Sequence, residues 1–233
     1  MDIAFLISIL PRLLQGLWMT IQICVVSLSI GTVIGILLGT VRVLGPRPVQ
    51  GLIGAYVTFV RGTPLILHVY AAFFLLPQVG VNLDAFWTGV VAVVFNTVGY
   101  QIEIVRAALE SIDRGQREAA AAIGMTNGMA MRLVVLPQAA RRMLPPLTNE
   151  FSNLIKASSV LSVIAIMELT KMAHAIIATT FRLADVFLVV SFMYFVIIQL
   201  LSWGSRYLEL NVFSIRSATS AVKRADATPV GPA

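Results

Sequence analysis

The stretch from Leu13 to Val41 contains no charged residue, and this feature constrains the fold more than any other. A helix of these 29 residues, at about 1.5 Å per residue, is longer than the roughly 30 Å hydrocarbon core of a bilayer. The whole chain is similarly apolar, because 58% of its residues are hydrophobic, 12% are charged and its mean hydropathy is +0.88. A water-exposed surface does not accommodate this composition, so the sequence predicts an all-α integral membrane protein.

Other apolar stretches predict four further membrane helices. Residues 62–83 and 85–102 carry no formal charge, and a clear final stretch covers residues 186–205. The stretch of about 143–169 is apolar but contains Glu150, Lys156 and Glu168. We expect five spans, at about 13–41, 57–80, 85–106, 143–170 and 184–205. They form a transmembrane domain of residues 1–216, and a disordered cytoplasmic tail of residues 217–233 is expected to follow.

The distribution of lysine and arginine predicts the orientation of the chain. With five spans, twelve of the seventeen basic residues fall on one side, in the connections after the first and third spans and in the C-terminal region. Because basic residues gather on the cytoplasmic side, we expect the N-terminus outside and the C-terminus in the cytoplasm. The formal net charge of +6 therefore reflects topology and does not indicate a nucleic-acid partner.

The small number of reactive side chains disfavours other chemistry. The single cysteine, Cys24, cannot form an intrachain disulfide, and the distant His68 and His174 do not indicate a metal site. No nucleophile with a neighbouring base and no pair of carboxylates at one depth indicates catalysis. We expect no metal site and no catalytic residue, so a membrane enzyme is disfavoured.

Two kinds of residue within the predicted spans bear on packing and function. Gly31, Gly35 and Gly39 lie on one helix face and predict the close approach of a neighbouring helix, not a ligand site. Lys156 lies among asparagines and serines on an otherwise apolar helix, where an isolated charge costs about 2.5 to 3.5 kcal/mol. Such a charge either pairs with another helix or lines a polar translocation path, and the sequence leaves both open.

A cytoplasmic loop of about 107–142 joins the third and fourth spans and is long for a connector in a compact bundle. The sequence predicts a short alanine helix that begins near Gln116 and ends at Gly124, and a second short helix capped by Thr126 or Asn127. Four consecutive alanines present little side chain, so a groove of another protein can close on this helix. The alternative is an interfacial helix that only reverses the chain.

The same loop carries a recognisable motif. Glu118-Ala119-Ala120 is followed after three residues by Gly124, and after nine more by Val134-Val135-Leu136-Pro137. This pattern resembles the EAA loop of ABC importer permeases. Around it, residues 56, 61–65, 100–106, 115–116, 136–139, 156–159 and 168–170 are similar to the permeases for polar amino acids. The similarity extends from about Gly16 to Leu210.

The resemblance implies a type I ABC importer permease bundle of five transmembrane helices in the bacterial inner membrane. It also implies a second permease subunit, identical or homologous, two cytoplasmic ATP-binding subunits, and a periplasmic or surface solute-binding protein that delivers a polar amino acid. The chain has no G-x-x-x-x-G-K-[ST] segment, so we expect no cofactor on it, and ATP and Mg belong to the partner ATPase. In the family the EAA helix docks in a cleft of the ATPase, which assigns coupling to Arg117, Glu118, Ala119, Ala120, Ala121, Ala122, Ile123, Gly124, Met125 and Thr126.

The resemblance further implies a substrate path through spans two, three and four. The candidates at matching positions are Arg61, Thr63, Leu67, His68, Asn96, Tyr100, Glu103, Lys156, Ala157 and Ser158. An amino acid zwitterion needs one partner for its carboxylate and one for its ammonium group, and charged side chains and interrupted helices supply both. His68 stands where the family often has glutamine. Ala157 stands where it often has aspartate, and the missing carboxylate, which could hold a cationic side chain, argues against arginine or lysine as the substrate. The alternative function is an ion-coupled secondary transporter, although no internal repeat supports it.

Overall fold

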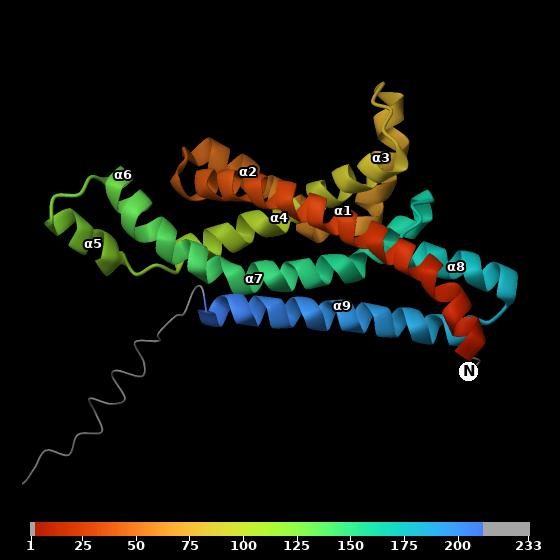
Figure 1. Cartoon of the computed structure of the whole chain (residues 1–233). Coiled ribbons are helices and arrows are strands. Elements are labelled where there is room, and N and C mark those ends of the chain that lie inside the picture. Colours follow the sequence, from red (N-terminus) through yellow and green to blue (C-terminus); the bar gives the residue numbers. More distant parts are fainter. Residues whose placement is uncertain (1–2, 212–233) are drawn as a thin grey trace, which may run out of the picture.

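The computed structural model describes residues 3–211, and all regular secondary structure in this range is helical (Figure 1). In chain order the elements are α1 (Ile3–Leu44), α2 (Arg47–Gly62), α3 (Leu65–Gln78), α4 (Ala85–Glu110), α5 (Arg114–Ala122), α6 (Asn127–Ala130), the π-helix η1 (Met131–Val135), α7 (Leu136–Ala157), the 3-10 helix η2 (Ser158–Ile164), α8 (Leu169–Thr180) and α9 (Leu183–Asn211). The predicted all-α class is confirmed. The predicted disordered tail, residues 217–233, lies outside the described residues.

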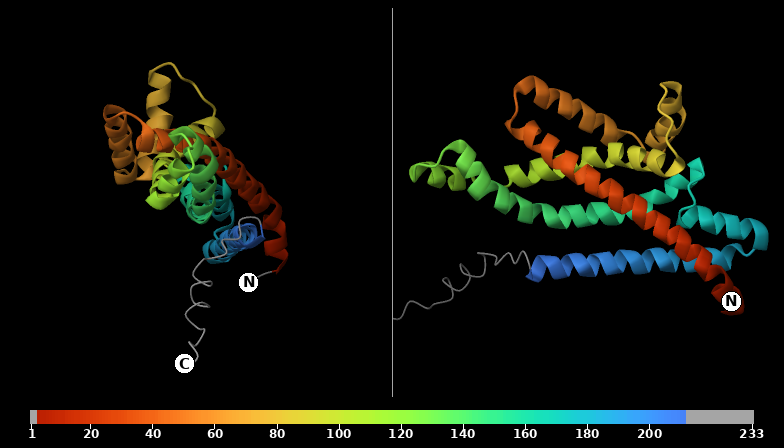
Figure 2. Two further views of the ribbon diagram at one scale, coloured as in Figure 1. Left: turned by 90° about the vertical axis from the view of Figure 1, so that its left-hand side faces the viewer. Right: turned by 45° about the horizontal axis from the view of Figure 1, so that its top comes forward.

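The long helices α1, α4, α7 and α9 form the body of the bundle and run roughly along one direction (Figure 1, Figure 2). Helix α4 contacts α1, α2, α3 and α7, and more than half of its residues are buried. Helices α5 and α6 project beyond one end of the body, whereas α8 and the described start of α1 lie at the other end (Figure 1). Helices α5 and α6 therefore lie at the opposite end of the bundle from α8.

Three helices within residues 3–211 are individually long and apolar enough to cross a membrane, namely Ile3–Leu44, Ala85–Glu110 and Leu183–Tyr207. Two further segments qualify only as bent pairs. Helices α2 and α3 meet at 104°, and the segment Asn127–Ile164 meets α8 at 52°. Length and composition thus provide three membrane-crossing helices in the described chain, or up to five when each bent pair counts as one span.

The bend between α2 and α3 follows from the sequence Thr63-Pro64. Thr63 has an extended backbone, with φ of −116° and ψ of 131°, as expected for a residue that precedes proline. Pro64 disfavours a helical backbone at Thr63 and has no N–H to donate, and here the extended Thr63 ends α2. The apolar stretch of residues 57–80 is therefore divided between two helices, and the first of them begins already at Arg47.

The second break lies between α7 and α8. After η2, Ala165 adopts a left-handed backbone with φ of 63°. Glu168 then caps α8, because its carboxylate accepts the backbone N–H of Thr170 at 2.9 Å and that of Lys171 at 2.6 Å. Glu168 is fully buried, and the hydroxyl of Tyr194 on α9 donates to its carboxylate over 3.4 Å. This buried cap fixes the start of α8 against α9.

Helices α1 and α4 approach closely through three glycines. Gly31, Gly35 and Gly39 of α1 face Thr97, Gln101 and Val105 of α4. A Cβ atom at Gly39 would lie 2.7 Å from the Cβ atom of Val105, which is closer than real side chains approach. The prediction that this stripe serves helix packing is confirmed.

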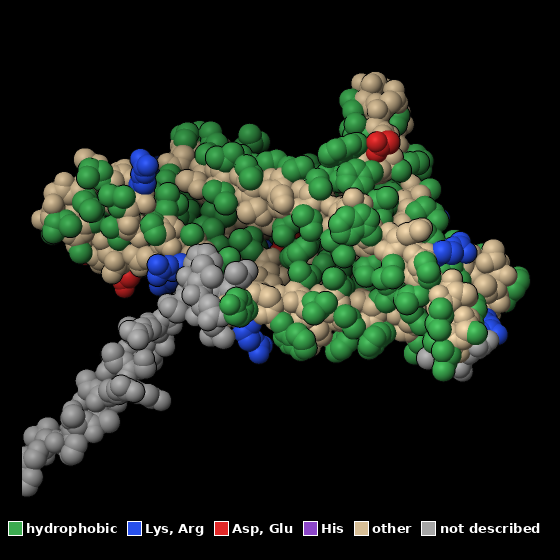
Figure 3. Space-filling view, in the orientation of Figure 1, with side chains coloured by type: hydrophobic (Ala, Val, Ile, Leu, Met, Phe, Trp, Pro, Cys, Tyr) green, Lys and Arg blue, Asp and Glu red, His purple; other side chains and the backbone are tan. Residues whose placement is uncertain are grey.

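The surface of the bundle is largely apolar. Figure 3 shows hydrophobic side chains across the middle of one face, with lysine and arginine side chains toward the two ends. On α9, Leu188, Phe192, Phe195 and Trp203 are each more than half exposed. Such a surface suits contact with lipid or with another apolar protein surface.

Candidate functional site

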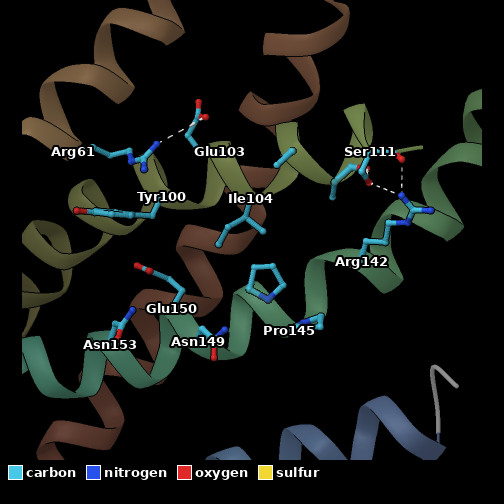
Figure 4. Close-up of a pocket in the computed structure, with 13 residues that line it drawn as sticks. Arg61, Tyr100, Glu103, Ile104, Ser111, Arg142, Pro145, Asn149, Glu150 and Asn153 are labelled. Carbon is cyan, nitrogen blue, oxygen red and sulfur yellow. Dashed lines mark hydrogen bonds and ion pairs between the residues drawn. The ribbon is translucent and has the colours of Figure 1, made fainter. Parts of the chain in front are cut away.

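A cavity of about 810 Å³, lined by both polar and apolar residues, lies between α2, α4 and α7 (Figure 4). Its lining comprises Arg61, Tyr100, Glu103, Ile104, Ala107, Ala108, Ser111, Arg142, Pro145, Pro146, Asn149, Glu150 and Asn153. In Figure 4, Tyr100 and Glu103 extend from α4 on one wall, and Asn149, Glu150 and Asn153 from α7 on the facing wall. The cavity therefore contains groups of both charges together with amides.

A second cavity of about 430 Å³ adjoins the first. The two share Arg61, Tyr100, Glu150 and Asn153. The second extends to the break between α2 and α3, where Thr63 and Pro64 line it, and to Asn96 and Ala157. Because they share lining residues, we treat the two cavities as one polar region beside an interrupted helix pair.

Glu103 forms ion pairs with arginines from three helices. Its carboxylate lies 3.3 Å from Arg42 of α1, 3.9 Å from Arg61 of α2 and 2.8 Å from Arg106 of α4. Arg106 lies three residues after Glu103 on the same helix, whereas the other two arginines come from distant parts of the chain. Arg106 also contacts Glu110 at 2.6 Å. Three arginines and two glutamates leave this cluster with a net charge of +1.

Arg61 is the most accessible arginine of this cluster. Its side chain is 49% exposed, against 22% for Arg42 and 34% for Arg106. Its guanidinium group lies 5.6 Å from the centroid of the Tyr100 ring, within the range of a cation–π interaction. Its contact with Glu103 is the longest of the three. Arg61 is therefore held in position and still available to an anionic group.

Glu150 brings a carboxylate into the polar region from α7. It lines both cavities and takes part in none of the ion pairs identified among residues 3–211. The family resemblance did not assign Glu150, Asn149 or Asn153 to the substrate path. The signal that identifies them is their spacing, because residues three or four apart share a helix face.

His68 and Asn96 join the polar region to an apolar cavity of about 520 Å³. The side-chain amide nitrogen of Asn96 lies 3.2 Å from Nδ1 of His68, within hydrogen-bond distance. His68 is 5% exposed and lines the apolar cavity with Leu67 and Thr63, whereas Asn96 lines the polar region. From the side of the apolar cavity, His68 therefore contacts the Asn96 side chain that lines the polar region.

The structure divides the predicted path residues among three settings. Arg61, Thr63, Asn96, Tyr100, Glu103 and Ala157 line the polar region, and Leu67 and His68 line the apolar cavity. Lys156 is exposed and lies outside the polar region. Ser158 is buried, and its hydroxyl donates to the carbonyl of Ile155 at 2.7 Å. Only the first group thus surrounds a common polar space.

The predicted coupling residues lie on and directly after α5, which projects from one end of the bundle (Figure 1). The helix begins at Arg114, and Asp113 caps it by accepting the N–H of Gly115 at 2.7 Å. Ala120 is buried and Met125 half-buried, whereas residues 117–119, 121–124 and 126 are exposed. The segment therefore presents an open face within the described chain.

Helix α5 ends at a glycine with a left-handed backbone. Gly124 has φ of 83°. Its N–H donates to the carbonyl of Ala121 at 2.9 Å, and the N–H of Met125 donates to that of Ala120 at 3.0 Å. These two bonds define a Schellman C-cap, which favours glycine at this position. Thr126 then caps α6 by accepting a backbone N–H at 3.3 Å.

Side-chain contacts connect the loop to the body of the bundle. Gln138 of α7 donates to Gln116 of α5 at 3.3 Å. Arg142 of α7 donates to the carbonyl and the hydroxyl of Ser111, at 2.5 and 2.9 Å. Val135 is fully buried in an apolar cluster with residues of α4 and α7. These contacts connect α5 to α7, and α7 to the end of α4.

An all-helical bundle with apolar helices of membrane length, a polar region beside a broken helix and a projecting helical loop has the features of a membrane transport subunit. Comparison with known proteins makes this class specific. Residues 31–214 match the family described as binding-protein-dependent transport system inner membrane component. The match covers well over half of the sequence, and the chain belongs to this family.

Individual relatives are transport proteins of the same kind. The chain is 38% identical over 202 residues to the glutamine transport system permease protein GlnP of Escherichia coli (strain K12), covering 86% of this chain and 92% of GlnP. It is 34% identical over 210 residues to the arginine transport system permease protein ArtQ of Bacillus subtilis, covering 90% and 96%. A chain in the crystal structure of an amino acid ABC transporter with histidines superposes with a TM-score of 0.84 at 33% identity, covering 90% and 98%.

These relationships confirm the predicted ABC importer permease and favour it over the ion-coupled alternative. The relatives are transport components and not enzymes, and the ATPase activity resides on a separate subunit. The family thus implies an importer with ATPase and binding-protein partners, and it describes an inner membrane component.

Proposed function

We propose that this chain and a second permease subunit, identical or homologous, form the transmembrane path for a polar amino acid in a bacterial inner membrane. The similarity to GlnP, to ArtQ and to the solved amino acid transporter supports this substrate class. The observation that carries the proposal is the polar region itself, where a guanidinium group and a carboxylate extend from different helices into one space.

The charges of the polar region suit a zwitterion. Arg61 supplies a partner for the α-carboxylate of the substrate, and Glu150 supplies one for its ammonium group. The amides of Asn96, Asn149 and Asn153 are available to a polar side chain. Glu103 is already paired with three arginines, and Ala157 has no carboxylate, so no second free acid faces a cationic side chain. We therefore propose a neutral polar amino acid as the substrate.

The proposed topology has five spans, with the N-terminus outside and the C-terminus in the cytoplasm. Each bent pair, α2 with α3 and the α7 segment with α8, forms one span. The clustering of basic residues in the loop of about 107–142 and near the end of α1 supports this orientation. In this arrangement residues 1–216 form the transmembrane domain, and the α5–α6 loop lies in the cytoplasm.

The proposed drive for transport comes through α5. The exposed alanines and Gly124 dock in a cleft of a partner ATPase, which binds ATP and Mg, and two such subunits serve the permease pair. Closure of the ATPase pair pushes α5, and the contacts of Gln116 and Ser111 pass this push to α7 and α4. A solute-binding protein delivers the amino acid at the opposite end of the bundle.

The test is uptake by the complete transporter, with permease, ATPase and binding protein, reconstituted in proteoliposomes. Labelled neutral polar amino acids are expected to accumulate only when ATP is supplied. The variant Glu150→Gln keeps the size of the side chain but removes its charge. We expect it to raise the half-saturating substrate concentration about tenfold, since a hydrogen bond to a charged group contributes roughly 1.5 to 3 kcal/mol.

The matched control is Glu110→Gln, because Glu110 contacts Arg106 outside the polar region. This variant is expected to leave the half-saturating concentration unchanged, and both variants are expected to retain the ATPase activity of the wild type. Uptake that follows an ion gradient without ATP would exclude the importer. Equal half-saturating concentrations for Glu150→Gln and the wild type would exclude the proposed ammonium contact.

A further inference from the structure

A separate cavity of about 500 Å³ lies at the base of the projecting loop. Its walls include Leu44 at the end of α1, Arg117 of α5, Gly128 of α6, and Met131 and Arg132 of η1. It shares no lining residue with the polar region. Its volume falls in the range of about 300 to 1,000 Å³ that is usual for pockets that bind small molecules.

Two arginines, Arg117 and Arg132, line this cavity, and none of its lining residues is acidic. The ion pairs identified among residues 3–211 belong to Arg42, Arg61 and Arg106, so neither Arg117 nor Arg132 is neutralised by a carboxylate there. Arginine presents several N–H donors in one plane, which matches the oxygens of a phosphate group. The charge of the cavity therefore favours a phosphate-bearing ligand.

The remainder of the wall is largely apolar. Leu44, Met131, Val135 and Leu136 contribute to it. Leu44 ends the longest apolar helix, and in the proposed topology this end of α1 reaches the cytoplasmic headgroup layer. A free inorganic anion gains nothing from an apolar wall, whereas a phospholipid offers a phosphate next to hydrocarbon.

The π-helical turn η1 contributes both a basic residue and apolar residues to the cavity wall. Met131, Arg132 and Val135 all belong to it and all line the cavity. Single π-helical turns are rare and frequently mark functional sites. Gly128, which also lines the cavity, leaves room, because no atom lies within 4 Å of the position of a Cβ atom there.

We propose that this cavity binds the headgroup of an anionic phospholipid of the cytoplasmic leaflet. Arg132 and Arg117 contact the phosphate, and the apolar wall contacts the start of the acyl chains. Basic pockets on the cytoplasmic side of membrane proteins recognise anionic headgroups by this chemistry. The proposal rests on the cytoplasmic placement of the loop, and it makes the lipid a link between the end of α1 and the loop.

The test is native mass spectrometry of the purified permease–ATPase complex, titrated with phosphatidylglycerol or with phosphatidylcholine of the same acyl chains. The wild-type complex is expected to bind phosphatidylglycerol more tightly. The variant Arg132→Gln is expected to weaken phosphatidylglycerol binding about fivefold and to leave phosphatidylcholine binding unchanged. Gly128→Glu, which adds a carboxylate at an uncrowded residue of the cavity wall, is expected to weaken phosphatidylglycerol binding further.

The control variant is Arg141→Gln, which removes an exposed arginine of α7 outside the cavity. The mass of the complex shows in each case whether the ATPase remains bound, so failure of the lipid site is distinguished from failure of coupling. The proposal is overturned if both lipids bind equally, or if Arg132→Gln behaves like Arg141→Gln. It is also overturned if millimolar inorganic phosphate displaces the lipid, or if the permease alone binds the lipid and the complex does not.

Discussion

Replacement of Gly124 tests whether the shape of the end of α5 governs its docking to the ATPase. Gly124 is in the left-handed region with φ of 83°, and no atom of the described chain lies within 4 Å of the position of a Cβ atom there. A side chain at this position therefore meets no neighbour in the described chain. The cost of Gly124→Ala is a backbone cost.

The magnitude follows from the conformational preference of L-residues. A residue with a Cβ atom loses about 1 kcal/mol in the left-handed region, so Gly124→Ala lowers the equilibrium constant for forming the native end of α5 roughly fivefold. Because only loops with the native end bind, the apparent dissociation constant of the ATPase is expected to rise by up to about fivefold, and the full factor applies when the native end becomes the minor form. Asparagine tolerates this region better, so Gly124→Asn is expected to raise it less.

The apparent dissociation constants are measured by titrating the detergent-solubilised permease over the purified ATPase immobilised on a sensor surface. Gly124→Asp has nearly the backbone cost of Gly124→Asn but adds a charge, so a larger loss for aspartate reports a desolvated contact with the partner. The control is Gly80→Ala, because Gly80 has φ of 84° and open space but lies in the connection after α3.

Two results would refute this reasoning. If Gly124→Ala binds the ATPase as tightly as the wild type, the Schellman end of α5 is not required for docking. If Gly80→Ala weakens binding as much as Gly124→Ala, the effect is a general loss of stability and not a change at the coupling surface.

Three further predictions concern the packing of α1 against α4, the cap of α8 and the positioning of Asn96 by His68. Gly39→Ala is expected to destabilise the fold by about 1 to 3 kcal/mol and to lower its thermal midpoint in detergent, because the added methyl group overlaps α4. The control Gly204→Ala is expected not to lower the midpoint, because no atom lies within 4 Å of the added Cβ atom. Glu168→Ala is expected to cost about 1 to 3 kcal/mol in the same assay, since it leaves two N–H groups of α8 without their acceptor, and an unchanged midpoint would contradict the buried cap. His68→Leu is expected to raise the half-saturating substrate concentration several-fold and to leave the ATPase activity unchanged. His68→Gln is expected to raise it less, because glutamine again offers an acceptor to Asn96. Equal half-saturating concentrations for the two variants would exclude a role of His68 in positioning Asn96.

The periodicity and charge of the sequence predicted the class of fold but not the ends of its helices. The charge-free stretch of residues 13–41 marked α1, yet this helix begins at Ile3 and passes through Pro11. Its first part is ordered by contacts of Ile9 and Leu13 with α8 and α9, which are distant in sequence. Local hydropathy contains no information about such contacts.

The angles of the broken helices were equally beyond sequence reasoning. The break at Pro64 fits a residue that cannot donate an N–H, but the 104° between α2 and α3 depends on the packing of α3 against α4. The π-helical form of η1 was not predicted either. Nothing in the residues 131–135 distinguishes a π-helical turn from an α-helical one.

The candidate site was predicted in part. The family resemblance placed Arg61, Asn96 and Tyr100, and all three line the polar region. It did not place Glu150, because the side of α7 that faces the polar region depends on the rotation of that helix against α4. The polar stripe around Lys156 indicated the right helix, but Lys156 itself lies outside the polar region.

The sharing of Glu103 among three guanidinium groups has an energetic consequence for a passing zwitterion. Arg61 is the most distant of the three arginines, at 3.9 Å, and the other two neutralise Glu103 without it. In the proposed path, a substrate carboxylate that pairs with Arg61 therefore leaves Glu103 paired with Arg42 and Arg106. Capture and release then require the movement of one side chain between two acceptors, and the bound carboxylate offsets the net charge of +1 of the cluster.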